Sequence, residues 1–284
     1  MPASPPADLD AQVDAALRED IGSGDVTAAL VPAAQQVRGR LVTREDAILC
    51  GRPWAEATFA RLDREVRLTW RAADGEPVSA GAVVFEIAGP ARAILTGERT
   101  ALNFLQLLSA TATVTRRFVD AVAGTECRII DTRKTLPGLR SAQKYAVRCG
   151  GGDNHRMGLY DRVLIKENHI AAAGSIAGAI ASARRTAPGI TVEVEVESLA
   201  ELEQALAAAP DIIMLDDFSL ADMRAAVARN RAAGRRARLE ASGSVALEAV
   251  RAIAETGVDY VSVGSLTKHV HAIDLSMRLE FGAG

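Results

Sequence analysis

The sequence predicts an α/β protein in which an antiparallel sheet is followed by parallel strands that alternate with helices. Between Val37 and about Ile87, apolar and polar residues alternate, with Gly and Pro between the runs. After Gly124, six short β-rich runs recur, and helical stretches separate the later ones. With 284 residues, of which 49% are hydrophobic, the chain can bury a core as one large or two modest domains.

The first part of the chain predicts a helix, a sheet and a long helical region. DAQVDAALRED, which begins at Asp10, has the pattern of a short amphipathic helix. VRGRLVTRE, VRLTWRAADG and AVVFEIAG predict an antiparallel sheet with one solvated face. Residues 97–124 then carry apolar side chains at helical spacing and predict one or two core helices: Leu102, Leu105, Leu108, Val114, Phe118 and Val122.

The second part predicts six strands: CRIID, DRVLIK, TVEVEVE, DIIMLD, ARLEAS and DYVSVG. Helical stretches such as SLAELEQALAAA lie between the later runs, so the strands should be parallel and joined by right-handed crossovers. Six strands are too few for the usual eight-stranded (β/α) barrel. From periodicity alone, an open doubly wound sheet and a smaller barrel both remain possible.

Positive charge is concentrated in one segment. The whole chain has a net charge of −3, but from Asp131 to Lys166 there are eight Lys or Arg against three Asp. A pI of about 5.9 argues against a nucleic-acid-binding protein, which would normally be basic across a domain. The local cations therefore predict a binding site for an anion.

Other features indicate where in the cell the protein works and the state of its cysteines. No apolar run approaches the roughly 20 residues that cross a bilayer, and MPASPPADLD lacks the basic and apolar regions of a signal peptide. We therefore expect a cytoplasmic protein with no membrane partner. Cys50, Cys127 and Cys149 are far apart in the sequence and have no metal-ligand spacing, so we expect reduced thiols.

Polar residues follow the predicted strands at their carboxyl ends, which form the binding face of both barrels and open α/β sheets. They are Asp131 with Arg133 and Lys134, Lys166, the glutamates of VEVEVE, Asp216 with Asp217, Glu240 with Ser242 to Ser244, and Gly264 with Ser265. Some such residues serve only as helix N-caps, which is the simpler interpretation of Ser198, Asp217 and Ser219. Together they predict a polar site.

Glu193, Glu195 and Glu197 alternate with valines, so they should point to the same side of their strand. A parallel strand is covered on both faces, and buried carboxylates are costly unless they are paired. At least one of the three should therefore have a cation or a metal as its partner.

Three glycine-containing segments predict ligand binding, and two of them predict phosphate binding. Gly150 to Gly152 precede Asn154, His155 and Arg156, in a loop that matches neither the Walker nor the Rossmann pattern. SGS at 242–244 and VGS at 263–265 come before predicted helix starts, where backbone N–H groups can face an anion. Cations, these segments and carboxylates together fit a multiply phosphorylated substrate bound with Mg²⁺.

Long motifs in this order resemble the quinolinate phosphoribosyltransferase family over nearly the whole chain: DTRKTLPGLR, KYAVRCGGGDNHRMGLYDRVLIKENHI, EVEVES, IIMLDDF, EASGSV and DYVSVGSLTKHV. The resemblance favours a barrel over an open sheet. It implies an incomplete (β/α) barrel of six or seven strands over residues 109–269 and an N-terminal α/β sandwich domain over residues 1–108. A C-terminal helix over residues 270–284 would pack on the sandwich.

The resemblance also implies an activity and roles for residues. The family joins quinolinate to 5-phosphoribosyl-1-pyrophosphate with Mg²⁺, and releases pyrophosphate and CO₂ to give nicotinate mononucleotide for NAD synthesis. Lys134, Glu195 and Asp216 would be catalytic, and the two acids would hold Mg²⁺ directly or through water. The implied substrate-binding residues are Arg99, Thr132, Arg133, Lys134, His155, Arg156, Lys166, Glu195, Asp216, Ser242, Gly243, Ser244, Val263, Gly264 and Ser265.

A homodimer is also implied, because the family places an arginine that matches Arg99 in the pocket of the neighbouring subunit. The resemblance leaves open a hexamer built from dimers. The alternatives are a molybdenum-transport-associated homologue, a nicotinate-specific enzyme and a non-catalytic phosphosugar-binding protein. The intact DTRKT and NHR motifs, together with Lys134, Glu195 and Asp216, favour the quinolinate enzyme over all three.

Overall fold

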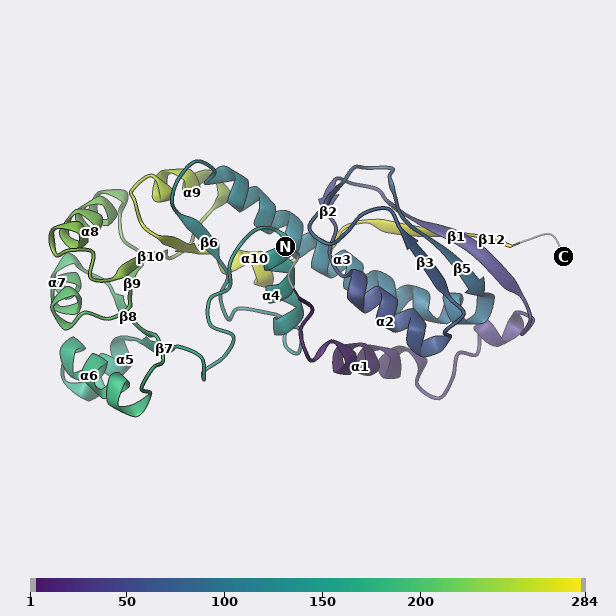
Figure 1. The fold of residues 1–284 in the computed structure, drawn as a ribbon, viewed down its shortest axis with the longest axis horizontal. Coiled ribbons are helices and arrows are strands. Elements are labelled where there is room, and N and C mark those ends of the chain that lie inside the picture. Colours follow the sequence, from purple (N-terminus) through teal and green to yellow (C-terminus); the bar gives the residue numbers. More distant parts are fainter. Residues whose placement is uncertain (1–3, 282–284) are drawn as a thin grey trace. The chain divides into compact units, whose positions relative to one another are not determined.

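The computed structural model describes residues 4–281, which form two compact units (Figure 1). The first unit contains the chain up to Arg116, residues 135–151 and the chain from Leu266 onwards. The second contains Arg117–Lys134 and Gly152–Ser265. The expected division at residues 108/109 and 269/270 thus needs a correction, because residues 135–151 lie within the expected barrel range but belong to the first unit.

The first unit contains a four-stranded antiparallel sheet, as predicted. Its strand order is β12 (Leu275–Phe281), β1 (Gln36–Thr43), β5 (Val83–Pro90) and β3 (Arg67–Trp70). A second, two-stranded sheet pairs β2 (Ala47–Ile48) with β4 (Pro77–Val78). Val37 and Leu41 of β1 are buried, while Arg38 and Arg40 between them are exposed, so one face of the sheet is solvated.

The predicted C-terminal helix over residues 270–284 is wrong for the part of it that the structure describes, and residues 282–284 lie outside that part. Leu275–Phe281 form β12, which pairs antiparallel with β1. The local sequence explains the difference. Leu275, Met277 and Leu279 alternate with polar residues, and a period of two suits a strand at a sheet edge rather than a helix.

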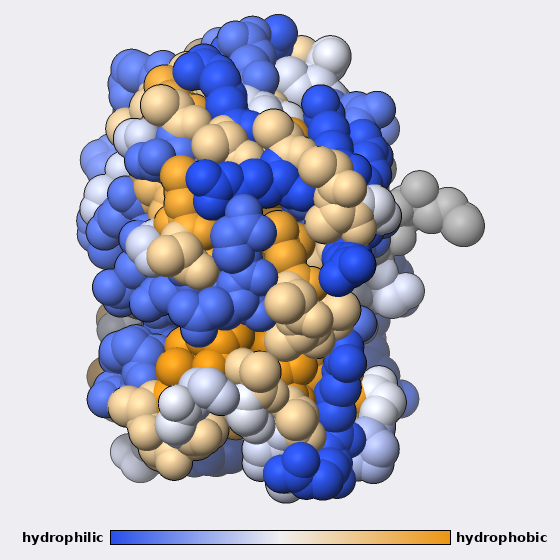
Figure 2. Space-filling model, turned by 90° about the vertical axis from the view of Figure 1, so that its left-hand side faces the viewer, coloured by the Kyte–Doolittle hydropathy of each residue, from blue (hydrophilic) through white to orange (hydrophobic). Residues whose placement is uncertain are grey.

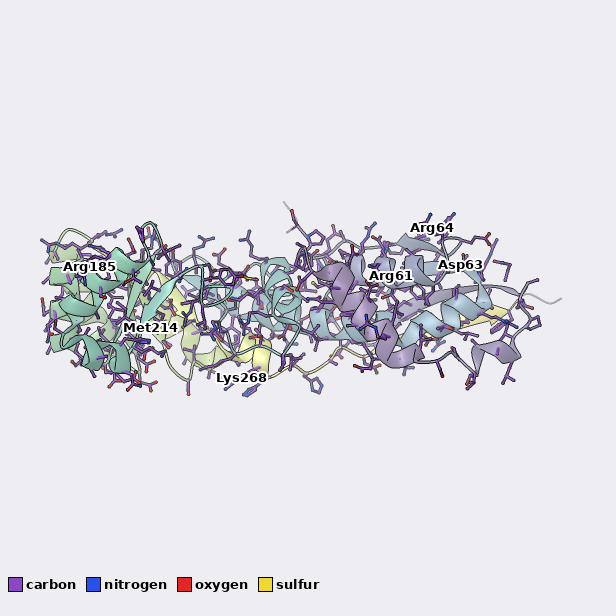
Figure 3. All side chains as sticks on the ribbon, turned by 90° about the horizontal axis from the view of Figure 1, so that it is seen from below. Arg61, Asp63, Arg64, Arg185, Met214 and Lys268 are labelled. Carbon is purple, nitrogen blue, oxygen red and sulfur yellow. The ribbon has the colours of Figure 1, made fainter. Side chains whose placement is uncertain are left out.

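Helices cover the sheet of the first unit. They are α1 (Leu9–Ile21), the short 3₁₀ helix Ala28–Leu30, α2 (Arg52–Leu62), the continuous α3 (Ala91–Ala121) and α4 (Arg140–Cys149). Leu102 and Leu105 of α3 pack with the sheet, while Phe104 and Leu108 pack with Trp54. Arg61 of α2, which is labelled in Figure 3, contacts Asp10 at 2.9 Å and also Asp14, and these ion pairs connect α1 to α2.

The second unit is built on six parallel strands, as the sequence predicts. Their order is β6 (Arg128–Ile130), β11 (Tyr260–Ser262), β10 (Arg238–Ser242), β9 (Ile212–Asp216), β8 (Val192–Val196) and β7 (Val163–Ile165). All five pairings between neighbours are parallel. Because β6 and β7 form the two edges of this sheet, the second unit is an incomplete (β/α) barrel with six strands.

Helices follow the strands of the second unit. They are α5 (Glu167–Ala173), α6 (Ile176–Thr186), α7 (Leu199–Ala208), α8 (Leu220–Ala232), α9 (Leu247–Ala254) and α10 (Ser265–Lys268). On the face that carries α6 to α8, hydrophilic residues cover most of the surface and apolar residues show between them (Figure 2). Among residues 4–281, no helix is both long enough and apolar enough to cross a membrane.

Candidate active site

The carboxyl ends of the parallel strands bring most of the predicted site residues to one edge of the second unit. In the register of the sheet, Ser242 pairs with Asp216, and Ile165 pairs with Val194. Lys166 follows Ile165 directly and therefore comes next to Glu195. Parallel strands end at the same edge, so residues more than 100 positions apart in the sequence become neighbours.

Lys166 and Glu195 form an ion pair. The Nζ atom of Lys166, at the end of β7, contacts Oε2 of Glu195 on β8. The Glu195 side chain is buried, whereas the Lys166 side chain is 44% exposed. The prediction that at least one glutamate of VEVEVE has a cation as its partner is therefore confirmed. The exposed amine can also meet an anion that enters from solvent.

The three glutamates have different environments. Glu193 lies within β8 with no exposed surface, 3.3 Å from Arg162 Nη1 and 3.0 Å from His155 Nε2. Glu197 lies beyond the strand and is exposed, and its backbone N–H donates to Glu201. Two of the three glutamates are thus buried on β8, and the cation beside Glu195 is the more exposed one, because the Lys166 side chain is 44% exposed and the Arg162 side chain 20%.

Asp131 holds the loop that follows the three consecutive glycines. Its Oδ1 accepts the backbone N–H of His155 at 2.9 Å, and its Oδ2 accepts Asn154 Nδ2 at 2.6 Å. Asp131 is fully buried, and ionised carboxylates accept strong hydrogen bonds in such places. The Asn154–Arg156 segment is thereby fixed beside the end of β6.

Arg133 and Arg156 bring two positive charges close together. Burial lowers the pKa of Arg156, and the charge of Arg133 lowers that pKa further, while Glu193 and Asp161 act against the shift. Arg133 Nε is buried and has no hydrogen-bond partner within residues 4–281. A buried donor beside a second guanidinium group favours the binding of an anion at this point.

Thr132, Lys134 and Gly264 lie together, because β6 and β11 are neighbours. The N–H of Lys134 donates to Thr132 Oγ1 at 3.0 Å. A Cβ atom at Gly264 would lie 3.0 Å from Lys134 Cδ and 3.5 Å from Thr132 Oγ1. Gly264 therefore leaves room against the exposed Lys134 side chain, while the neighbouring Val263 is buried and donates its N–H to Ile130.

The SGS segment follows β10 and packs on the end of β9. Ser242 accepts the N–H of Asp217 at 3.1 Å. Gly243 has a φ of +138°, and a Cβ atom there would lie only 2.4 Å from Asp217 Oδ1. Both features require glycine. Asp216, Ser242, Gly243 and Ser244 are at least partly exposed, so this segment can receive a ligand.

The remaining predicted residues have separate positions. Ser265 begins α10, and Arg99 is an exposed residue of α3 in the first unit. Ser198 and Ser219 are N-caps, as predicted, because their hydroxyl groups accept N–H donors of α7 and α8. Asp217 is not the cap of α8, although it lies near its start.

One contact beside the site was not predicted from the sequence, although Glu240 was expected among the polar residues at the strand ends. Glu240 of β10 is fully buried, 3.6 Å from His155 Nε2 and beside Glu193. The predicted substrate residue His155 is also buried, and its Nδ1 accepts the N–H of Arg156 at 2.7 Å. A charged residue between the apolar Leu239 and Ala241 in the middle of β10 was the signal for Glu240.

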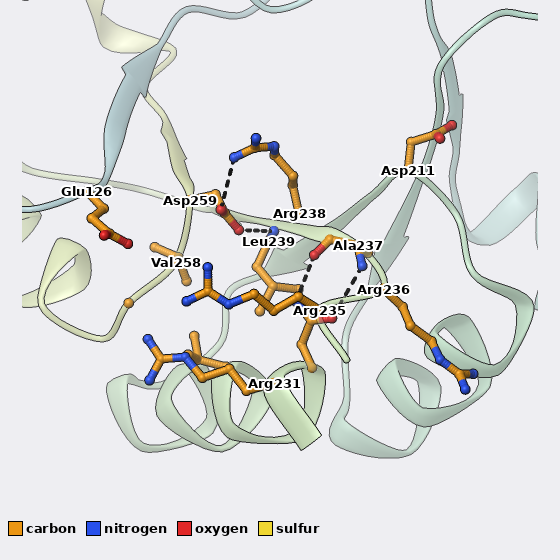
Figure 4. Close-up of a pocket in the computed structure, with 13 residues that line it drawn as sticks. Glu126, Asp211, Arg231, Arg235, Arg236, Ala237, Arg238, Leu239, Val258 and Asp259 are labelled. Carbon is orange, nitrogen blue, oxygen red and sulfur yellow. Dashed lines mark hydrogen bonds and ion pairs between the residues drawn. The ribbon is translucent and has the colours of Figure 1, made fainter. Parts of the chain in front are cut away.

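A basic cavity lies at the opposite ends of the strands (Figure 4). Arg238, the first residue of β10, contacts Asp259 at 3.3 Å, and Asp259 also accepts the N–H of Leu239. Arg231, Arg235 and Arg236 line the same cavity and are exposed. None of the predicted site residues lines this cavity, and the carboxyl ends of the strands remain the candidate active site.

Comparisons with known proteins agree with this arrangement. Residues 25–109 match the family model for the N-terminal domain of quinolinate phosphoribosyl transferase, and residues 111–278 match the model for its C-terminal domain. The chain is 44% identical over 271 residues to a nicotinate-nucleotide pyrophosphorylase [carboxylating] of Mycobacterium leprae, which covers 93% of this chain and 94% of that protein.

Two further relatives are similar over nearly the full length. A probable nicotinate-nucleotide pyrophosphorylase [carboxylating] of Bacillus subtilis is 42% identical, covering 91% of this chain and 89% of that protein. The solved structure of the nicotinate-nucleotide pyrophosphorylase from Francisella tularensis is 47% identical, with a TM-score of 0.94 and 98% of each chain covered. The chain belongs to the quinolinate phosphoribosyl transferase family.

Proposed function

We propose that the chain transfers the phosphoribosyl group of 5-phosphoribosyl-1-pyrophosphate to quinolinate and removes one carboxylate as CO₂. The products are nicotinate mononucleotide and pyrophosphate, in the cytoplasm, as a step of NAD synthesis. Family membership supports the reaction. The single observation that carries it is the pair of arginines, Arg133 and Arg156, in which a buried guanidinium nitrogen lacks a hydrogen-bond partner within the described residues.

Quinolinate has two adjacent carboxylates, and the cations of this edge suit them. Arg133 and Arg156 can each bind a carboxylate through two parallel N–H groups, and Lys166 adds a third positive charge. Each charged hydrogen bond contributes about 1.5–3 kcal/mol. Replacing Arg156 or Lys166 by Ala should therefore weaken quinolinate binding by at least that amount in a calorimetric titration. Unchanged affinity would remove these residues from the subsite.

The glycine-containing segments suit the phosphates of the second substrate. The 5-phosphate would lie against Ser242, Gly243, Ser244, Val263, Gly264 and Ser265. At Gly243 and Gly264 a Cβ atom would crowd the neighbouring side chains. Without a Cβ atom, the backbone N–H groups at these positions are open to a phosphate. Thr132 and the exposed Lys134 are next to Gly264, where Lys134 can contact both substrates.

The carboxylates at the ends of β8 and β9 fit Mg²⁺. Glu195 and Asp216 are the donors, directly or through water, because Mg²⁺ prefers one or two carboxylates together with phosphate oxygens. Within residues 4–281, neither acid belongs to a group of three ligating side chains, so the substrate would supply further oxygens. When bound, the ion would neutralise charge on the departing pyrophosphate.

The residues of the chain then assist bond exchange. The bond between C1′ of the ribose and the pyrophosphate oxygen breaks, and pyrophosphate keeps the electron pair. The carboxylate of Glu195 stabilises the positive charge on the ribose, and the quinolinate nitrogen forms the new bond to C1′. The resulting pyridinium ring accepts the electron pair of the C2–carboxylate bond as CO₂ leaves, and C2 then takes a proton.

The proposal includes a homodimer in which Arg99 reaches the site of the partner subunit. Arg99 is exposed, so it is available for such a contact. Mixing inactive Arg99→Ala chains with inactive Lys134→Ala chains should restore part of the activity, since some hybrid sites would contain both side chains. Hybrids that remain inactive, although both parents fold and dimerise, would exclude the shared site. Sedimentation would show whether dimers form a hexamer.

A single assay tests the reaction itself. The pure protein is incubated with quinolinate, 5-phosphoribosyl-1-pyrophosphate and Mg²⁺, and CO₂ and nicotinate mononucleotide should form in equal amounts. Nicotinate in place of quinolinate should not react, and chelation of Mg²⁺ should stop turnover. Quinolinate binding without pyrophosphate release would instead indicate a binding protein, and a rate that is insensitive to chelation would contradict the role of Mg²⁺.

A further inference from the structure

A buried cluster of three ionisable side chains lies beneath the proposed quinolinate subsite. It consists of His155, Glu193 of β8 and Glu240 of β10, and one ligand atom from each lies within 4.8 Å of the others. Both glutamates have no exposed surface, and His155 is 6% exposed. Buried carboxyl groups of this kind are costly unless their charges and hydrogen bonds are compensated.

The charges of the cluster can be assigned from its contacts. Arg162 Nη1 lies 3.3 Å from Glu193 Oε2, and His155 Nε2 lies 3.0 Å from the same oxygen. Burial raises the pKa of Glu240 well above its ordinary value, and the adjacent Glu193 raises it further. Two buried carboxyl groups side by side cannot both be ionised at low cost, and Arg162 contacts Glu193, so Glu240 is the group that keeps a proton.

Both nitrogens of His155 face other groups of the protein. Nδ1 accepts the backbone N–H of Arg156 at 2.7 Å, so it carries no proton. The proton of the neutral ring is therefore on Nε2, which faces Glu193 and Glu240. The ring links the buried acids to the backbone of Arg156, which carries a guanidinium group of the proposed quinolinate subsite.

We propose that Glu240 is a positioning residue: as a neutral acid it donates a hydrogen bond to Glu193, and the pair fixes the His155 ring and, through it, Arg156. This inference rests on the proposed function, because it assigns the cluster to quinolinate binding. The hydrogen bond from the Arg156 N–H to His155 Nδ1 carries this effect from the ring to Arg156. Glu193 is the hydrogen-bond acceptor of the cluster, with Arg162 and His155 as its other partners.

Two substitutions of similar size separate this role from simple filling of the core. In Glu240→Gln the amide can still donate to Glu193, whereas in Glu240→Leu the donor is lost. Glu240→Leu should raise the KM for quinolinate about tenfold or more, the effect expected from one lost buried hydrogen bond. Glu240→Gln should stay within about threefold of the unchanged protein. The KM for 5-phosphoribosyl-1-pyrophosphate should not change in either variant.

The result that would overturn the proposal is equally specific. If Glu240→Gln loses as much quinolinate affinity as Glu240→Leu, the hydrogen-bond donor is not what matters. If the KM values for both substrates rise together, the cluster supports the fold and not the subsite. Thermal unfolding of each variant shows that it is folded, and the conservative Gln variant keeps the test decisive even if the Leu variant does not fold.

A second measurement does not depend on activity. The chain has four histidines, so ¹⁵N-labelled histidine gives a simple NMR spectrum, in which a His155→Gln variant identifies the His155 signals. These signals should show that Nδ1 carries no proton, both in the unchanged protein and in Glu240→Gln, because Nδ1 accepts the N–H of Arg156. A proton on Nδ1 would overturn the proposed arrangement.

The two measurements also distinguish the failure of the cluster from the failure of the proposed reaction. If the unchanged protein forms no nicotinate mononucleotide from quinolinate, the proposed function fails. The NMR spectrum would then still decide the arrangement of His155, Glu193 and Glu240. If the protein is active but the Gln and Leu variants behave alike, only the role of Glu240 fails.

Discussion

Strands β1 and β8 contain similar alternating sequences but have different surroundings. In β1, QVRGRLVT, buried Val37 and Leu41 alternate with the exposed Arg38 and Arg40. In β8, VEVEV, every residue is buried, including Glu193 and Glu195. A charge on a half-solvated antiparallel strand is a surface residue, but a charge on a fully covered parallel strand needs a specific partner. The same alternating pattern thus indicates a strand with one solvated face in the first unit and a candidate site in the second.

Two acids show the same contrast. Asp74 in the first unit accepts the N–H groups of Gly51 and Arg52 at 3.1 Å each, and the hydroxyl group of Tyr145 at 2.8 Å. It therefore satisfies donors at the start of α2. Glu240 in the second unit lies beside His155 and Glu193, and within residues 4–281 neither of its buried oxygens accepts a hydrogen bond from a backbone N–H group. A buried acid that accepts backbone donors stabilises a fold, whereas a buried acid without such donors, beside other ionisable side chains, marks a candidate functional site.

The largest expected effect that separates the two units is on activity. Lys134→Ala should lower kcat/KM about 10²–10³-fold, because an exposed cation beside the reacting groups is lost while little packing changes. The melting temperature should stay close to that of the unchanged protein. Arg38→Ala, which removes an exposed cation from β1, is the matched control and should leave kcat/KM unchanged. Nearly full activity of Lys134→Ala would remove this residue from the site.

The second expected effect is on stability. Asp74→Ala should destabilise the protein by about 2–3 kcal/mol, because two backbone N–H groups and one hydroxyl group lose their acceptor. Denaturant titration measures the loss, and the kinetic constants of the protein that remains folded should not change. Asp74→Asn keeps one acceptor oxygen, so its stability should lie between that of the unchanged protein and that of Asp74→Ala. A change in KM without a change in stability would contradict the structural role of Asp74.

Two glycines give a smaller and opposite pair of effects. A Cβ atom at Gly39 of β1 would lie 2.7 Å from the backbone oxygen of Arg278 in β12, so Gly39→Ala should cost about 1–2 kcal/mol of stability. Gly264→Ala would instead place its Cβ 3.0 Å from Lys134 Cδ. It should raise the KM for 5-phosphoribosyl-1-pyrophosphate about tenfold with little loss of stability. If the two substitutions lowered stability equally, the expectation that Gly39 supports the fold and Gly264 the site would be wrong.

The smallest expected effect is a dependence of stability on pH. Burial raises the pKa of Glu240 above its unfolded value, so the folded state holds this proton at pH values where the unfolded state releases it. The contribution of Glu240 to stability is therefore fully present below its unfolded pKa and is lost as the pH rises. The stability of Glu240→Gln relative to the unchanged protein should accordingly increase with pH. Parallel curves of melting temperature against pH would exclude this titration.

Regular periodicity and strand ends allowed much of the molecule to be predicted. The six parallel strands and the antiparallel sheet follow from runs that alternate or are β-branched, and the grouping of Lys166 with Glu195 follows from the rule that parallel strands end together. The barrel itself came from the resemblance to a family, and so did the erroneous C-terminal helix. The alternation of Leu275, Met277 and Leu279 with polar residues was the better guide there.

Contacts that depend on packing could not be predicted. Glu240 lies close to Glu193 because β8 and β10 both flank β9, which no local pattern reveals. Cys50 and Cys149, which are nearly 100 positions apart, lie close to each other and to Asp74 in the first unit, although all three cysteines are free thiols. Such neighbours are fixed only when the helices and sheets have packed.

The course of residues 135–151 limits how the molecule can be divided. This segment interrupts the second unit between the DTRK and NHR motifs, and its helix α4 packs Tyr145 against Trp54 in the first unit. A fragment cut to contain the barrel alone would therefore carry helix α4 without the residues on which it packs, between the two motifs of the candidate site. Each unit is compact, but each is built from more than one stretch of the chain. A single genetic crossover therefore cannot exchange one whole unit between relatives.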